Sequence, residues 1–129
     1  MESERRVIGD FGRVLGGAAG DEIDRMDPLL GSPPSTLLLA SSFDHNASYQ
    51  LCIEEMIQTV PGHDGTTNPL VRADMVYVPR ESGGAVFSVG SMTYAGSLPI
   101  DGGNSVIGKL TANVLSRFLD PAPFELPTL

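Results

Sequence analysis

Two neighbouring glutamates are the residues of this sequence whose type and placement best suit acid–base chemistry. Glu54 and Glu55 lie at opposite flanks of the polar face of a helix expected over residues 47–60. Leu51 stands between them on that face, which suggests that another segment covers it. A carboxylate in a water-poor place can act as a general base or acid with a raised pKa, or can bind a metal. Two solvated helix charges are the alternative, and helix geometry alone does not choose between the two glutamates.

A histidine and an asparagine directly follow a predicted strand. In open α/β sheets ligands bind where the carboxyl end of a strand meets the following helix, so residues 41–46 are the first place to look for a site. Histidine suits proton transfer or metal binding near neutral pH, which makes His45 a third catalytic candidate. A local hydrogen-bonding or capping role explains His45 and Asn46 equally well.

Other motifs that carry chemistry are weak or absent in this sequence. His45 and His63, with Asp44 and Asp64, have no tight ligand spacing such as H-E-x-x-H, so no metal site within the chain is predicted. The stretch "GGAAGDEIDR" departs from G-x-G-x-x-G and no predicted strand precedes it, which favours a packed loop. Without a G-x-S-x-G elbow, a serine-hydrolase triad is not expected.

The strands that would position these residues can be read from apolar runs. Residues 36–41, "TLLLAS", form a continuous apolar run between turn residues, which predicts a strand covered on both faces in a mostly parallel sheet. Residues 72–79 and 85–91 predict a β-hairpin about a Gly-Gly turn. Small residues from position 90 to 97 then permit close approach of another backbone or a ligand, and a protein segment is the expected occupant.

Helical periodicity marks two further segments. Apolar residues at helical spacing predict one helix over residues 47–60 and a second over residues 105–119, which Pro121 and Pro123 stop. The order strand, helix, hairpin, helix indicates an α/β layer with antiparallel strands at one edge. The expected organisation is a glycine-rich loop segment at 1–35, an α/β region at 36–120 and an irregular tail at 121–129.

Composition excludes several classes of function. The chain has 129 residues and a net charge of −8, and its eight Lys and Arg residues are scattered. Nucleic-acid binding and attraction to an anionic membrane are therefore not expected. No segment has the length and apolarity of a signal peptide or a membrane span, and the single Cys52 allows no internal disulfide. We therefore expect a soluble protein of the reducing cytoplasm.

Taken together, five segments resemble one known family. They are "GGAAGDEIDRMDPLLGSPPSTLLLASS", "YQLCIEEM", "NPLVRADMVYVP", "GGAVFSVGSMTYAGSLP" and "IGKLTANVLSRFLD". In this order they are similar to the C-terminal part of the large (beta) subunit of N,N-dimethylformamidase, over about residues 8–120. Where relatives tend to have an "NGYDN"-like loop this sequence has "PIDGGNSVIGK", which leaves the substrate open.

The resemblance implies an amide hydrolase that cleaves small N-substituted formamides to formate and an amine. It implies part of a class I glutamine amidotransferase-like (flavodoxin-like) three-layer α/β sheet with an antiparallel edge hairpin. It also implies an iron held by tyrosine and carboxylate side chains upstream of the matched region, outside this chain. Carried over to this sequence, Glu54, Glu55 and His45 are the catalytic candidates. Asn46, Phe87 and Tyr94 are candidates for binding the amide, although core packing also explains Phe87 and Tyr94.

The resemblance also sets the expected partners. Family large subunits are several times longer than 129 residues, so we expect this chain to be incomplete alone. It would associate with the rest of a large subunit, with a small subunit or with itself, and the small residues at 90–97 would face that missing part. The alternative is a non-catalytic α/β half-domain that binds a partner through an exposed sheet edge.

Overall fold

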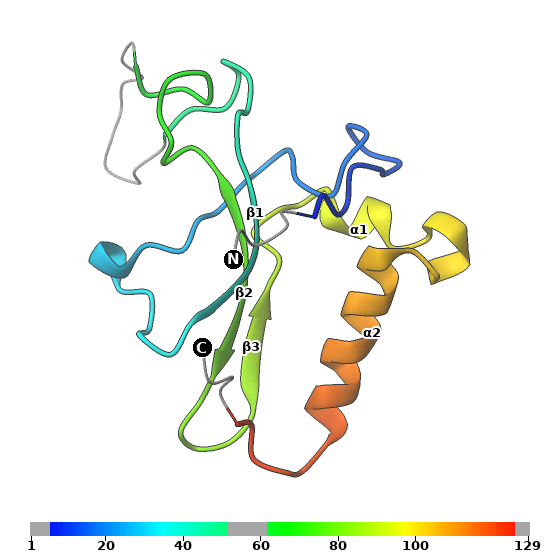
Figure 1. Cartoon of the computed structure of the whole chain (residues 1–129). Coiled ribbons are helices and arrows are strands. Elements are labelled where there is room, and N and C mark those ends of the chain that lie inside the picture. The colour runs from blue at the N-terminus through cyan, green and yellow to red at the C-terminus, as the bar shows by residue number, and fades with distance from the viewer. Residues whose placement is uncertain (1–5, 52–61, 126–129) are drawn as a thin grey trace. The chain divides into compact units, whose positions relative to one another are not determined.

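The computed structural model describes residues 6–51 and 62–125 in two compact units (Figure 1). One unit is Glu22–Gly90, and the other combines Met1–Asp21 with Ser91–Leu129. No helix among the described residues is long and apolar enough to cross a membrane. The described elements, in chain order, are η1 (Pro28–Leu30), β1 (Leu37–Ser42), β2 (Ala73–Pro79), β3 (Ala85–Ser88), α1 (Tyr94–Ser97), η2 (Ile100–Gly103) and α2 (Val106–Leu119).

The sheet of the first unit has the order β1-β2-β3, and both strand pairs are antiparallel. The strand expected at residues 36–41 is confirmed as β1, but its assignment to a mostly parallel sheet is wrong. Coverage on both faces is also wrong, since Leu38 and Leu39 are 50% and 44% exposed. The register of β1 against β2 shifts between Leu38 and Ala40, which makes Leu39 an extra, bulged residue. The bulge interrupts the inside–outside alternation, so the sequence shows an apolar run in a strand that is only partly covered.

The predicted hairpin is confirmed. β2 and β3 pair from Val76 opposite Ser88 to Pro79 opposite Ala85, and β3 ends at Ser88 rather than residue 91. Gly83 and Gly84 both have positive φ values, 87° and 75°, as the tight connection requires.

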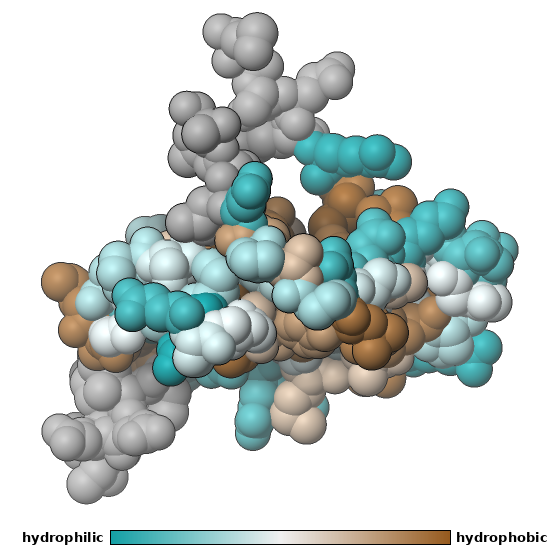
Figure 2. Space-filling view, turned by 90° about the horizontal axis from the view of Figure 1, so that it is seen from below, coloured by the Kyte–Doolittle hydropathy of each residue, from teal (hydrophilic) through white to brown (hydrophobic). Residues whose placement is uncertain are grey.

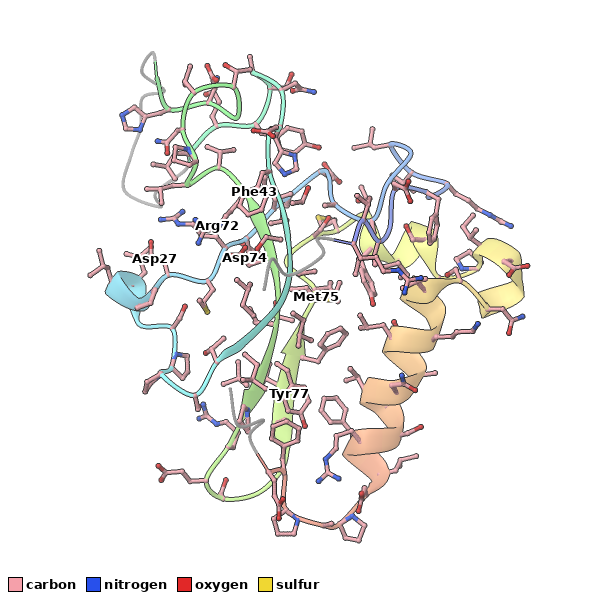
Figure 3. All side chains as sticks on the ribbon, viewed as in Figure 1. Asp27, Phe43, Arg72, Asp74, Met75 and Tyr77 are labelled. Carbon is pink, nitrogen blue, oxygen red and sulfur yellow. The ribbon has the colours of Figure 1, made fainter. Side chains whose placement is uncertain are left out.

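Both faces of β2 are buried. Successive side chains of a strand point to opposite faces, so Ala73, Met75 and Tyr77 share one face and are 3–7% exposed. Asp74 and Val78 lie on the other face, at 2% and 8% exposed. Figure 3 shows Asp74, Met75 and Tyr77 in succession along the strand.

The N-terminal segment is a loop, as predicted, with one short 3-10 turn. Asp27 caps η1 by accepting a hydrogen bond from the Leu29 amide, and Gly31 ends it with φ 95°. Farther along, the backbone amide of Asp24 donates to the Gly90 carbonyl, and the amide of Asp74 donates to the Asp24 carbonyl. The segment is therefore tied along the start of β2.

The helix expected over residues 47–60 does not begin at Ala47. Residues 47–51 form a turn and an extended stretch, and residues 52–61 lie outside the described residues. The Asn46 side chain accepts from the Ser48 amide, while the Leu51 amide donates to the His63 carbonyl. The Gly65 amide donates to the Tyr49 carbonyl. Pairing with residues 63–65 thus takes the backbone bonds that a helix would have used.

The second unit contains the predicted C-terminal helix, confirmed as α2. Ser105 caps it by accepting from the Gly108 amide at 3.1 Å, and the helix ends at Leu119, before Pro121. Ile107 is 1% exposed, whereas Leu115 is 55% exposed. Only the first turns of the apolar face are therefore buried deeply.

The small residues at 91–97 pack against the chain's own N-terminal loop, so the expectation that they face a missing domain is wrong. The Ser97 hydroxyl donates to the Phe11 carbonyl at 2.6 Å, and the Arg13 amide donates to the Gly96 carbonyl at 3.1 Å. A Cβ on Gly96 would lie 3.0 Å from the Val14 side chain. Small side chains are needed here because two backbone segments of the same unit meet closely.

Hydrophobic side chains also reach the surface. On the face shown in Figure 2 they appear in several places between hydrophilic residues. Within the first unit the exposed large hydrophobic residues are Leu29, Leu30, Leu38, Leu39, Phe43, Leu70 and Val86.

Candidate functional site

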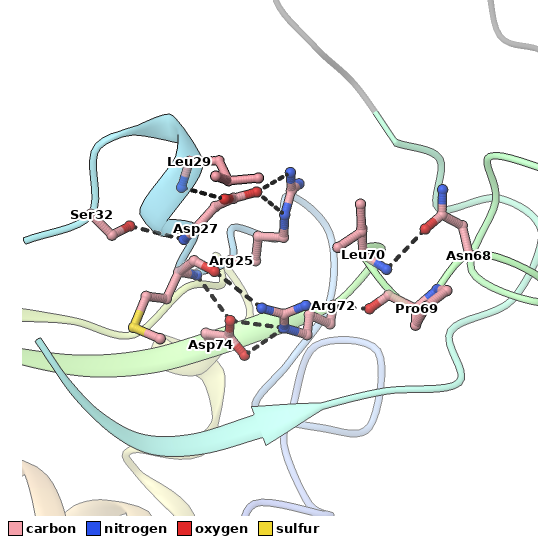
Figure 4. Close-up of polar contacts among 10 residues, drawn as sticks. Arg25, Asp27, Leu29, Ser32, Asn68, Pro69, Leu70, Arg72 and Asp74 are labelled. Carbon is pink, nitrogen blue, oxygen red and sulfur yellow. Dashed lines mark hydrogen bonds and ion pairs between the residues drawn. The ribbon is translucent and has the colours of Figure 1, made fainter. Parts of the chain in front are cut away.

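A buried carboxylate organises the start of β2. Asp74 has a fully buried side chain, and its two oxygens accept hydrogen bonds from three neighbours (Figure 4). The Met26 amide donates at 2.9 Å, the Ser41 hydroxyl at 2.7 Å and the Arg72 Nε at 2.9 Å. One carboxylate therefore joins the N-terminal loop, β1 and β2.

Arg72 compensates the charge of Asp74 and extends the network. Its side chain is 21% exposed, and its Nη2 donates to the Met26 carbonyl at 3.0 Å. Figure 3 shows the two side chains close together at the beginning of β2. A buried charge is tolerated when it is paired and hydrogen-bonded, so this pair is suited to holding a fixed geometry.

A second ion pair fixes the loop above the sheet. Arg25 donates to Asp27 through both Nε and Nη2, at 3.1 and 2.8 Å, and the Ser32 hydroxyl accepts from the Asp27 amide. The hydrogen bond from Arg25 and the amide of Leu29 hold the pKa of Asp27 below its ordinary value of 3.8, against a smaller opposing effect of desolvation. The loop keeps one conformation between residues 25 and 32 as a result.

A small pocket lies between this loop and the sheet. Its volume is about 100 Å³, and its walls come from Met26 and Pro33 on the loop side and from Val76, Val78 and Ser88 on the strands. The hydroxyl oxygen of Thr36 is buried and has no hydrogen-bond partner among the described residues, and Thr36 also lines the pocket. The pocket therefore combines apolar walls with an unsatisfied hydroxyl.

A second, more polar pocket follows the end of β1. It has a volume of about 170 Å³ and is formed by Phe43, Asp44, Val71 and residues 65–69. Asp44 adopts a left-handed backbone conformation with φ 56°. Nearby, the hydroxyl and amide of Thr66 hold the pKa of Asp64 below its ordinary value. The expectation that the chain end of β1 is a functional place has a cavity beside it.

His45 lies in the same region. Its ring packs on Tyr49 with the ring centres 4.8 Å apart, and a Cβ on Gly65 would collide with the His45 backbone. Nε2 of His45 is buried without a hydrogen-bond partner among the described residues, as is Nδ1 of His63. An imidazole nitrogen in this state can exchange a proton only with a group that reaches it.

The other predicted site residues are separated along the fold. Glu54 and Glu55 lie outside the described residues. Asn46 uses its side chain to cap Ser48, and Phe87 stands on β3 opposite Tyr77. These placements bring only His45 and Asn46 together.

Tyr94 belongs to the other unit and has a structural environment. It is 5% exposed, and its hydroxyl lies 2.7 Å from the Thr111 hydroxyl, which in turn donates to the Ile107 carbonyl. Burial raises the pKa of Tyr94 above its ordinary value of 10.0, and the hydrogen bond with Thr111 partly opposes this shift. The contact joins α1 to α2.

The iron implied by the resemblance finds no site in the part of the chain that the structure describes. There, no group of three or more His, Cys, Asp or Glu side chains could hold a metal ion. Tyr94, a residue type expected among the ligands, already bonds Thr111. The described residues do not fit an iron centre.

Reasoning from sequence missed Arg72, Asp74 and Thr36. One signal was present: Asp74 interrupts the otherwise apolar strand "ADMVYV" and follows Arg72 by two residues, the spacing that places two side chains on one face of a strand. A charged residue inside an apolar strand, with an opposite charge on its own face, indicates a buried ion pair. Thr36 carried no comparable signal.

Comparisons with known proteins agree with the segments that carry the resemblance. Residues 4–107 match the family described as "N,N-dimethylformamidase beta subunit-like, C-terminal". The chain is 43% identical over 125 residues to the N,N-dimethylformamidase beta subunit of Alcaligenes sp, covering 95% of this chain and 16% of that protein. It is 43% identical over 118 residues to the beta subunit of Paracoccus aminophilus, covering 90% of this chain and again 16% of the relative. This chain therefore belongs to the family of N,N-dimethylformamidase beta subunit-like C-terminal regions.

Proposed function

We propose that this chain forms the C-terminal part of a dimethylformamidase-like amide hydrolase that cleaves small N-substituted formamides to formate and an amine. The observation that carries the proposal is the 43% identity over 95% of the chain to a protein named N,N-dimethylformamidase beta subunit. The chain spans 16% of the length of that relative. Its contribution would be one wall of an active site that other segments complete.

The fold proposal follows the same reasoning. In a class I glutamine amidotransferase-like sheet, the antiparallel strands β1, β2 and β3 would form one edge, and further strands would come from outside this chain. Exposed Leu38, Leu39 and Val86 support this arrangement, because hydrophobic side chains of this size are usually covered in an assembled protein. Iron, if the enzyme uses it, would be bound by residues outside this chain, and no step of the reaction is assigned to it here.

Amide hydrolysis needs a group that takes a proton from water and returns it to the leaving amine. Glu54 and Glu55 are the proposed carboxylates for this role, and His45 is a second proton carrier through its unpartnered Nε2. The Asp74 network would keep β1, β2 and the N-terminal loop rigid around them. A rigid frame matters because small displacements of a catalytic group cost much of its effect.

A non-catalytic partner-binding role is the second candidate function. It is favoured by the lack of a metal-binding group among residues 6–51 and 62–125. In that case the chain would bind the rest of a large subunit, a small subunit or a second copy of itself, and no proton transfer would depend on it.

The test is a chimera in which this whole chain replaces the matching C-terminal region of the Paracoccus aminophilus beta subunit. We expect the chimera to release dimethylamine from N,N-dimethylformamide, and Glu54→Gln or Glu55→Gln to lower kcat by at least about 100-fold in one of the two variants. Glu81→Gln, at an exposed position in the hairpin turn, is the matched control and should leave kcat unchanged.

Two results would contradict the catalytic role. An assembled chimera in which Glu54→Gln, Glu55→Gln and His45→Gln all keep full activity would leave only the partner-binding function. An assembled but inactive chimera would refute the dimethylformamidase-like role itself. Size-exclusion chromatography establishes assembly in each case, and cell fractionation of the natural protein tests the proposed cytoplasmic location.

A further inference from the structure

We infer that the pocket between residues 24–36 and the strands β2 and β3 is a binding site for a small uncharged carbonyl compound, with the Thr36 hydroxyl as its hydrogen-bond donor. That such a ligand would be an amide substrate or product rests on the proposed function. The binding itself does not, because it is argued from the pocket alone.

The first argument is the unsatisfied hydroxyl. Leaving a buried hydroxyl without a partner is unfavourable, and native structures hold few such groups. Thr36 Oγ1 is buried and lacks a partner among the described residues, although it lines a cavity of about 100 Å³. A molecule in that cavity could accept the hydrogen bond that the protein leaves unmade.

The second argument is the charge of the walls. Asp74 and Arg72 bond each other, and Arg25 bonds Asp27, so the buried charges around the pocket already have partners. Asp24 is exposed and solvated, which weakens its attraction for a cation. The groups left to recognise a ligand are the hydroxyls of Thr36 and Ser88, which suit a neutral molecule.

The third argument is size and shape. A volume of 100 Å³ corresponds to about three molecules of liquid water, so only a ligand of a few heavy atoms fits. Val76, Val78 and Met26 would contact its methyl groups. The loop over the pocket is held by the Asp74 and Asp27 networks, so little ordering is needed on binding.

The experiment is a titration of the full chain, observed by ¹H–¹⁵N NMR, with N,N-dimethylformamide, formate and dimethylammonium as separate probes. We expect saturable shifts of the Thr36, Val76 and Ser88 amides with the neutral amide and none with the two ions. Thr36→Val, which removes the hydroxyl and keeps the shape, should weaken the binding at least about tenfold.

Thermal unfolding of the same variant provides an independent readout. Because the Thr36 hydroxyl is unsatisfied, Thr36→Val should keep or raise Tm. Thr111→Val is the matched control, since its hydroxyl donates to the Ile107 carbonyl, and it should lower Tm. A fall of Tm in Thr36→Val equal to that of Thr111→Val would overturn the inference, because the hydroxyl would then serve the fold.

Other outcomes overturn the inference as clearly. Amide shifts that do not saturate, or that persist unchanged in Thr36→Val, would leave the pocket to water only. Stronger shifts with formate or dimethylammonium would make it an ion site. An inactive chimera would refute the proposed function and leave this binding result standing, so the two failures can be told apart.

Discussion

Removal of the Asp74 carboxylate should destabilise the first unit more than removal of any surface carboxylate. In Asp74→Ala the Met26 amide and the Ser41 hydroxyl each lose a bond to a buried charge. Arg72 loses its ion-pair partner but keeps its bond to the Met26 carbonyl. The N-terminal loop and β1 therefore both lose an attachment to β2.

The magnitude follows from these contacts. A hydrogen bond to a charged group contributes about 1.5 kcal/mol at the lower end of its range, which applies to the bonds from Met26 and Ser41. The loss at Arg72 is smaller, about 1 kcal/mol, because its side chain is 21% exposed and water can replace the partner. The free energy of unfolding should therefore fall by about 4 kcal/mol in total. Asp74→Asn keeps acceptors for the two neutral donors and should cost about half as much.

The assay is urea unfolding followed by far-ultraviolet circular dichroism, with hydrogen exchange of the Met26 amide as a local readout. Asp120→Ala is the matched control, since Asp120 pairs with Arg117 at the surface and its side chain is 50% exposed. It should change the free energy of unfolding by no more than about 0.5 kcal/mol. Equal midpoints for Asp74→Ala and Asp120→Ala, with an unchanged Met26 exchange rate, would refute the reasoning.

Three further predictions test other parts of the fold. Gly90→Ala should destabilise the chain by at least about 2 kcal/mol more than Gly83→Ala: both glycines have positive φ, but only a Cβ at Gly90 collides with backbone carbonyls, and equal urea midpoints would contradict this. Ile107→Ala should cost about 3 kcal/mol and Leu115→Ala less than about 1 kcal/mol, because the first side chain is 1% and the second 55% exposed; the comparison uses the same unfolding curves. The pKa of Asp27 is depressed in the folded state, so its stabilising effect is present above the ordinary pKa of 3.8 and is lost as pH falls through the lower, folded value. Asp27→Asn should therefore flatten this acidic limb in a pH series of Tm, and an unchanged limb would argue against the Arg25 bond as its cause.

The elements that sequence predicted well are those set by local signals. The hairpin has two glycines with positive φ at its turn, and α2 has a serine cap and a proline beyond its end, so neighbours in sequence decide both. The elements predicted wrongly depend on distant partners. Residues 47–51 bond to residues 63–65 instead of to their own next turn. The direction of β1 depends on its pairing with β2, about 35 residues later, and an apolar run contains no information on that direction.

The candidate site shows the same division. His45 and Asn46 could be named from sequence because they follow a strand, and a cavity does lie beside the end of that strand. Thr36 could not be named, because a threonine becomes informative only when its hydroxyl is buried without a partner. That property depends on the loop before it and on the strands after it.

The small residues at 90–97 show why a correct pattern can still have a wrong explanation. Their size indicated that another segment approaches closely, and the structure places Phe11, Arg13 and Val14 there. The approaching segment comes from the same unit, so these residues make no demand for an external partner. The case for association therefore rests on different residues, the exposed Leu38, Leu39 and Val86 of the sheet. If the chimera assembles, substitution of these three by polar residues should disturb its assembly, whereas the same change at Leu115 should not.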